Sequence, residues 1–157
     1  MNIGVIADTH DNLPKIEKAV RFFNRRRVEF VLHAGDFIAP FAAVRFKALS
    51  CEFRGVFGNN DGERQGLNKI SDGKIQAGPL RVSLDNRRIL VVHDINSVDL
   101  TTENIDLIIF GHTHKPEIRH SNSSLLVNPG ECSGWLSSHA SIAIVDLKTF
   151  SSRIFYL

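Results

Sequence analysis

The stretch IGVIADTH, residues 3–10, is a short apolar run that ends abruptly in polar residues. A run of this length, rich in Val and Ile, is typical of a strand that is buried on both faces of a sheet. Four further runs end in Asp, Asn or His in the same way, at residues 30–36, 53–59, 89–93 and 107–114. Because sites in open α/β sheets form beyond the carboxyl ends of the strands, we expect the five polar ends to meet in one site.

The composition is that of an ordinary globular domain. The chain has 157 residues, of which 43% are hydrophobic, so it can bury a core that is stable without disulfides or a structural metal. We therefore expect a single domain over residues 1–157. The 19 Lys and Arg nearly cancel the 17 Asp and Glu. The formal net charge of +2 gives no general attraction to nucleic acid or to acidic membranes.

The cysteines and the apolar segments bear on the compartment. Cys51 and Cys132 are far apart in sequence and too few to form a disulfide framework. No stretch has the length of a membrane span, and the first strand-like run lacks the basic flank of a signal peptide. We therefore expect a cytoplasmic protein with no membrane partner. The sequence is compatible with a homo-oligomer.

The first half of the chain predicts a βαβαβ arrangement. Asn12 as a cap and Pro14 in the first turn start a helix that extends to about Arg27. A second strand over residues 29–33 and a shorter helix over residues 40–49 then lead to a third strand over residues 52–57.

The second half predicts mostly strands. Turn signals separate short apolar segments, and a short helix is expected near residues 97–103. The expected strands cover residues 80–84, 88–92, 106–110, 116–120, 125–127, 141–147 and 152–156. Two sheets packed face to face, with helices outside, would bury all of these apolar segments.

The polar strand ends carry residues that bind metal ions. Asp8 and His10 are two residues apart, as are His112 and His114, so each pair would point to one side of an extended backbone. Carboxylates combined with neutral imidazoles suit Mn, Fe, Co, Ni or Zn better than Ca. Seven candidate ligands are present: Asp8, His10, Asp36, Asn59, His93, His112 and His114.

Seven ligands exceed what one ion needs beside its water, so the count indicates two ions with a shared ligand. Asp36 is the natural bridge, because a carboxylate has two oxygens that can each bind one metal. Gly35, Gly58 and Gly111 precede candidate ligands, where we expect the backbone to turn sharply off a strand.

Five motifs in order resemble those of the calcineurin-like metallophosphoesterases, closest to the small single-domain phosphodiesterase branch: Asp8-x-His10, Gly35-Asp36, Gly58-Asn59-x-Asp61, His93 and Gly111-His112-x-His114. The resemblance implies an α/β fold, a four-layer αββα sandwich of two mixed β-sheets flanked by helices. It implies one metal held by Asp8, His10, Asp36 and His114, and a second held by Asp36, Asn59, His93 and His112. Asn59 would also contact the substrate phosphate, and we expect Asn59, Asp36 and His112 to act in catalysis.

The resemblance implies hydrolysis of a small phosphoester, a phosphodiester rather than a monoester, with two divalent ions for which Mn is the first expectation. Two ions about 3.5–4 Å apart would lower the pKa of a bridging water and stabilise the phosphoryl oxygens during in-line displacement. A bridging hydroxide would then attack without a covalent intermediate.

Two positions depart from the family pattern. Asn60 stands where many members carry a His that resembles the general acid for the leaving alkoxide, and an amide cannot serve as that acid. Asp94 stands where relatives commonly have Gly, which alters the loop near the second metal. We expect Asp61 to cap the helix that follows it, and His33 to be a strand-end or surface residue rather than a ligand.

Two other functions remain as alternatives. The retromer scaffold subunit resembles this fold but has lost its metal ligands and serves as a protein-binding surface, whereas all seven candidate ligands are present here. An enzyme that recognises a nucleobase would be expected to carry a basic and aromatic stripe, and the sequence lacks one.

Overall fold

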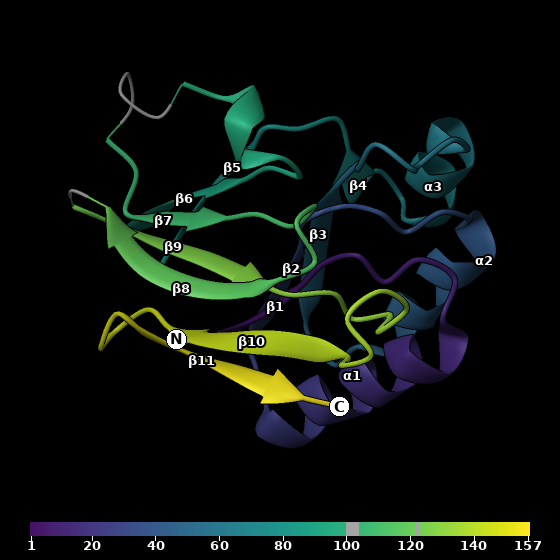
Figure 1. The fold of residues 1–157 in the computed structure, drawn as a ribbon, viewed down its shortest axis with the longest axis horizontal. Helices are drawn as coiled ribbons and strands as arrows, with labels where there is room; N and C mark the ends of the chain where they lie inside the picture. The colour runs from purple at the N-terminus through teal and green to yellow at the C-terminus, as the bar shows by residue number, and fades with distance from the viewer. Residues whose placement is uncertain (100–103, 122) are drawn as a thin grey trace.

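The computed structural model describes residues 1–99, 104–121 and 123–157, which form two facing β-sheets and a few helices (Figure 1). The first sheet has the strand order β11-β10-β1-β2-β3-β4. Strands β1 to β4 run parallel, and β10 and β11 are antiparallel to their neighbours. Its strands are β1 (Asn2–Ile6), β2 (Phe30–His33), β3 (Glu52–Val56), β4 (Ile75–Gln76), β10 (Ser141–Asp146) and β11 (Ser151–Tyr156).

The second sheet has the order β5-β6-β7-β9-β8 and is also mixed. Strands β6, β7 and β9 are parallel, while β5 and β8 pair antiparallel at the edges. Its strands are β5 (Leu80–Leu84), β6 (Arg87–Val91), β7 (Leu107–Ile109), β8 (Pro116–Ser121) and β9 (Ser124–Pro129). The prediction of two mixed sheets packed face to face is confirmed.

The main core lies between the two sheets. Ile3 and Val5 of β1 pack there with Val91 of β6, Ile109 of β7 and Val127 of β9, and all five side chains are fully buried. Because alternate residues of a strand point to opposite faces, the neighbouring positions of β1 face the helices instead. The apolar runs that define the strands in the sequence are therefore buried on both faces.

Helix α1 (Leu13–Arg26) covers the outer face of the first sheet. As predicted, the Asn12 side chain caps it by accepting a hydrogen bond from the Lys15 N–H at 3.3 Å. Its buried stripe includes Ile16 and Phe23. The packing is close, because a Cβ at Gly4 would lie 2.7 Å from the Phe23 ring.

Three shorter helical segments complete this layer: α2 (Pro40–Ala43), the 3₁₀ helix η1 (Val44–Ala48) and α3 (Arg64–Ile70). The single helix predicted over residues 40–49 is therefore divided into an α and a 3₁₀ part. Phe46 of η1 stacks on Phe53 of β3 with ring centroids 4.8 Å apart, which fixes this segment on the sheet.

The outer face of the second sheet is covered more thinly within the described residues. Ile95 and Val98 pack on a cluster that includes Leu90, Phe110 and Leu126. The 3₁₀ turn η2 (Ile95–Ser97) lies here, whereas residues 100–103 of the predicted helix lie outside the described residues. Among the described residues, no helix is long and apolar enough to cross a membrane.

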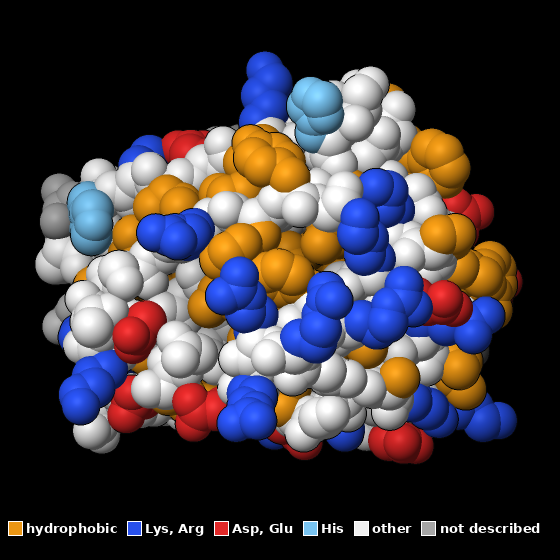
Figure 2. Space-filling model, turned by 90° about the horizontal axis from the view of Figure 1, so that it is seen from below, with side chains coloured by type: hydrophobic (Ala, Val, Ile, Leu, Met, Phe, Trp, Pro, Cys, Tyr) orange, Lys and Arg blue, Asp and Glu red, His pale blue; other side chains and the backbone are white. Residues whose placement is uncertain are grey.

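The face that carries α1 and β11 is rich in basic side chains, with apolar side chains between them (Figure 2). Arg26 at the end of α1 lies 5.2 Å from the ring centroids of both Phe22 and Phe155. The guanidinium group of Arg26 is therefore packed against two aromatic rings.

Candidate metal centre

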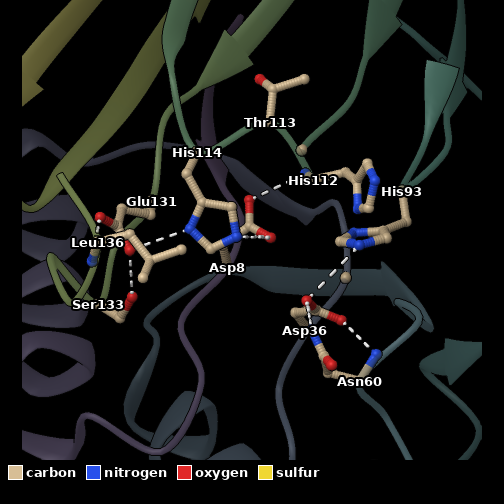
Figure 3. Close-up of polar contacts among 12 residues, drawn as sticks. Asp8, Asp36, Asn60, His93, His112, Thr113, His114, Glu131, Ser133 and Leu136 are labelled. Atoms are coloured by element: carbon tan, nitrogen blue, oxygen red, sulfur yellow. Dashed lines mark hydrogen bonds and ion pairs between the residues drawn. The ribbon is translucent and has the colours of Figure 1, made fainter.

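The carboxyl ends of the parallel strands in both sheets bring four candidate ligands together, of which Figure 3 labels Asp8, Asp36 and His114. Each offers one ligand atom, and these atoms all lie within 4.8 Å of one another. The group consists of Asp8, His10, Asp36 and His114. Asp8 follows β1, Asp36 follows β2, and His114 follows β7, so three strands from two sheets supply this cluster.

Asp8 is fully buried and has one oxygen without a hydrogen-bond partner. Its Oδ2 accepts a hydrogen bond from the His112 N–H at 3.1 Å, but its Oδ1 has none among the described residues. Burial, with the nearby Asp36 carboxylate, raises the pKa of Asp8 to about 8. A buried carboxylate oxygen in this setting is suited to a cation, so the donor set fits a divalent metal ion.

His114 is oriented by a residue that the sequence analysis missed, Glu131. The His114 Nδ1 lies 3.1 Å from Glu131 Oε2, while its Nε2 lies 3.7 Å from Asp8 Oδ1. Burial of Glu131 opposes ionisation, but hydrogen bonds from Ser137, His114 and Ser133 outweigh it and lower the pKa of Glu131 to about 2. An ionised Glu131 accepts a hydrogen bond from the His114 Nδ1–H, which leaves the Nε2 lone pair free for a metal.

The three other candidates lie beside Asp36. Asn59 Oδ1 is 2.7 Å from His93 Nε2 and 3.0 Å from His112 Nδ1, and His93 Nε2 is 3.6 Å from Asp36 Oδ2. The His93 Nδ1 lies 2.8 Å from the Ala34 carbonyl, so in the neutral ring Nδ1 carries the proton. Nε2 and Asn59 Oδ1 are then two acceptors that face one another, an arrangement that suits a cation between them.

Asp36 stands between the two groups of ligands and is held by Asn60. The Asn60 backbone N–H donates to Asp36 Oδ1 at 2.9 Å, and its side-chain Nδ2 donates to Oδ2 at 2.7 Å. The residue at the position where many family members carry a His is therefore a hydrogen-bond donor to the Asp36 carboxylate.

The backbone of the ligand loops differs from the extended form that the spacing argument assumed. Five candidate ligands have left-handed backbones, with φ of 48° at Asp8, 44° at His10, 62° at Asp36, 67° at His112 and 61° at His114. Asp8 and His10 thus reach one cluster through tight turns beyond β1, whereas His112 and His114 lie in different groups of candidate ligands, and the extended-strand explanation was wrong. Such conformations cost about 1–3 kcal/mol each and persist only where the surroundings impose them.

The glycines before the ligands serve two different purposes. Gly35 has φ of +96° and provides the predicted sharp turn. Gly58 and Gly111 are instead needed for space, because a Cβ would lie 2.0 Å from Asp36 Oδ1 at Gly58 and 2.8 Å from Asp8 Oδ2 at Gly111. The prediction of a turning role was wrong for these two residues, since neither has a positive φ.

Asp61 is buried and fixes two ligand loops, so its prediction as a helix cap was wrong. Its Oδ1 accepts hydrogen bonds at 2.7 Å from the N–H groups of Phe37 and Ile38. Its Oδ2 accepts from the N–H groups of Asp36 at 3.1 Å and Gly58 at 2.7 Å. The N-cap of α3 is Glu63, which makes no side-chain capping bond.

His33 lies at the end of β2, as expected, and is fully buried. Burial holds the pKa of His33 well below its usual range, so the ring is neutral. Its Nδ1 accepts the Gly35 N–H at 3.0 Å, which leaves Nε2–H to donate to Thr9 Oγ1 at 3.0 Å. Thr9 in turn donates to the Asp36 carbonyl at 3.3 Å, so this chain of bonds joins the first two ligand loops.

These residues match a known family. The model for the calcineurin-like phosphoesterase superfamily domain matches residues 1–150. The chain belongs to the calcineurin-like phosphoesterase superfamily. Phosphodiesterase MJ0936 of Methanocaldococcus jannaschii is 35% identical over 156 residues, which cover 94% of each chain. The solved structure of an archaeal phosphodiesterase is 33% identical, covers 100% of both chains and has a TM-score of 0.91.

The same superfamily fold occurs in proteins of more distant sequence. The structure of Vps29 from Entamoeba histolytica, complexed with Zn²⁺, is 18% identical, with a TM-score of 0.73 over 100% of this chain and 98% of that chain. At this identity the similarity concerns the fold alone. The family resemblance and the fold class that the motifs predicted are confirmed, and the chain is a phosphoesterase by family.

Proposed function

We propose that this phosphoesterase hydrolyses small phosphodiesters with two divalent metal ions. The first ion would be held by Asp8, His10, Asp36 and His114, and the second by Asp36, Asn59, His93 and His112. The observation that carries the proposal is the position of Asp36. It belongs to the cluster of four ligand atoms that lie within 4.8 Å of one another, and it also lies beside His93, which with His112 contacts the Asn59 amide oxygen.

Two divalent ions bound there supply an activated water and neutralise charge that develops on the phosphoryl group. The chain's own residues do the positioning. Glu131 and the Ala34 carbonyl set which nitrogens of His114 and His93 carry protons, so that the other nitrogen of each ring faces the centre. Asn59, which is exposed, is placed to contact a phosphate oxygen beside His93.

Asn60 predicts how the rate depends on the leaving group. Because Asn60 cannot donate a proton as an acid, hydrolysis depends on a leaving group that departs as an anion. Loss of general-acid help typically costs about 10²–10⁴-fold for poor leaving groups, so we expect aryl diesters to turn over faster than alkyl diesters, with a steeper dependence on leaving-group pKa than in a relative with His at this position. The rates of a series of diesters, plotted against leaving-group pKa, measure this. A rate that does not change with leaving-group pKa would contradict the proposal for Asn60. Asn60→Ala removes the side-chain hydrogen bond to Asp36 and is the control for that contact.

The test of the proposed function is hydrolysis of matched aryl phosphomonoesters and phosphodiesters with Mn²⁺, Ni²⁺ or Zn²⁺. We expect the diesters to be hydrolysed, and fastest with Mn²⁺. The alternative is a non-catalytic scaffold of this fold, in line with the Vps29 neighbours. Absence of both bound metal and turnover would favour that alternative, whereas the complete ligand set favours the enzyme.

The compartment belongs to the same proposal. Both cysteines, the half-buried Cys51 and the buried Cys132, are free. Free thiols agree with a reducing cytoplasm, where we place the enzyme together with a small phosphoester substrate.

A further inference from the structure

A cavity of about 400 Å³ opens directly beside the Asn59 and His93 side chains. Its other walls include Phe57, Arg64, Pro79 and Asp94, with further apolar side chains from the flanking loops. This volume lies within the range of small-molecule sites. A phosphate held at Asn59 would therefore have an adjoining space into which one of its ester groups could extend.

Arg64 is an oriented cation on the wall of this pocket. Its Nε donates to the Asp61 carbonyl at 3.1 Å and its Nη2 to the Gly58 carbonyl at 3.2 Å. Its Cζ lies 5.5 Å from the Phe57 ring centroid. No carboxylate of the described residues lies within 4.0 Å of this guanidinium, so its charge is available to an anionic ligand.

Asp94 adds an acceptor to the same pocket. Its Oδ1 accepts hydrogen bonds from the Asn96 N–H at 2.9 Å and Nδ2 at 3.1 Å, which fixes the side chain at the start of η2. Asp94 is also the residue that departs from the common Gly of the fourth motif. The pocket therefore combines an apolar wall, one fixed cation and one fixed acceptor beside the phosphate position.

We propose that this pocket binds the organic group of the substrate and selects aromatic or heteroaromatic phosphoesters over small alkyl ones. The inference rests on the proposed function, because it assumes a phosphate at Asn59 and His93. Arginine guanidinium and aromatic planes favour flat rings, and the apolar wall rewards their burial. A methyl group would leave most of the pocket to water.

Binding of two phosphomonoesters to the Mn²⁺-loaded protein tests this by affinity rather than by rate. The probes are methyl phosphate and 1-naphthyl phosphate, measured by titration calorimetry. We expect 1-naphthyl phosphate to bind at least about tenfold more tightly, as burial of part of a ring predicts. Ala77→Trp fills the pocket from an exposed position on its rim and should reduce the ratio of the two affinities to about one.

Lys115→Trp is the matched control, since Lys115 is exposed and does not line this pocket. The ratio should stay at its wild-type value in that variant. Equal affinities of the wild type for the two probes would overturn the pocket assignment. An affinity ratio that is unchanged in Ala77→Trp would overturn it as well. A metal-loaded wild type that binds neither probe would also overturn the pocket assignment, whereas the proposed function fails only if phosphodiesters are not hydrolysed.

Discussion

At the scale of single residues, the site depends on buried polar groups that hold the candidate ligands. Glu131, Asp61 and His33 are buried, and each is joined by hydrogen bonds to a loop that carries ligands. A buried polar group is stable only when it is hydrogen-bonded, so each of these residues has a defined set of partners. Their substitution should therefore change the geometry of the ligands rather than the metal chemistry itself.

Glu131→Gln should weaken metal binding about 10–100-fold, because the amide no longer fixes the Nδ1 proton of His114. Calorimetric titration of the metal-free variant with Mn²⁺ measures this, at a temperature where circular dichroism shows the fold intact. Glu117→Gln is the matched control, since Glu117 is on β8 and pairs with the exposed Arg119. Unchanged Mn²⁺ affinity in a folded Glu131→Gln protein would refute the role of Glu131.

Thr9→Val should lower the free energy of unfolding by about 1–3 kcal/mol, because it leaves the buried His33 Nε2–H without an acceptor. Thr9→Ser keeps the hydroxyl and is the matched control. Chemical denaturation of the metal-free proteins gives both values. Val keeps the methyl group of Thr9 and Ser keeps its hydroxyl, so a Thr9→Val protein as stable as the wild type, or as stable as Thr9→Ser, would contradict the role of the hydrogen bonds.

At the scale of secondary-structure elements, the apolar runs predict every strand except the two-residue β4 to within one or two residues, because burial on both faces leaves a continuous signal. The predicted strand over residues 80–84 coincides with β5. The turns beyond the strand ends are less predictable. The left-handed turns at Asp8 and His112 have no sequence signature of their own, since non-glycine residues adopt them only under tertiary constraint.

The sequence does not reveal Glu131 and Asp61 as partners of the candidate ligand loops, for a related reason. Glu131 comes directly after Gly130, which has φ of 77°, and belongs to no periodic pattern. Asp61 lies close before α3, and so its position resembled that of a cap. A carboxylate that serves distant backbone groups and one that caps a helix look alike in sequence, and only the tertiary fold separates them.

Gly58→Ala tests the close approach of the loop after β3 to the ligand site. A Cβ would lie 2.0 Å from Asp36 Oδ1, so Asp36 must move and metal affinity should fall at least about tenfold, which is about 1.4 kcal/mol. Gly62→Ala is the matched control, because a Cβ there would meet nothing within 4 Å. Elemental analysis of the Mn²⁺-loaded variants measures the outcome, and wild-type metal content in Gly58→Ala would contradict the steric argument.

At the scale of the whole molecule, we propose that residues 1–157 form one domain. Strand β1 pairs with β10 on one side and β2 on the other, so the two ends of the chain share a sheet. The core between the sheets contains residues of both halves of the chain. The site lies where loops from both sheets meet, and the backbone bonds from Asp8 to Gly35 and from Cys132 to Ala7 hold these loops together at 3.0 and 2.9 Å.

The number of metal ions per chain tests the central claim most directly. After loading with Mn²⁺ and removal of free metal, elemental analysis should give two ions per wild-type chain. Asp36→Asn should give one or none, because the amide cannot bridge two ions, and Asp72→Asn, an exposed turn residue, should retain two. Fewer than two ions in the wild type, or two ions in Asp36→Asn, would contradict the account.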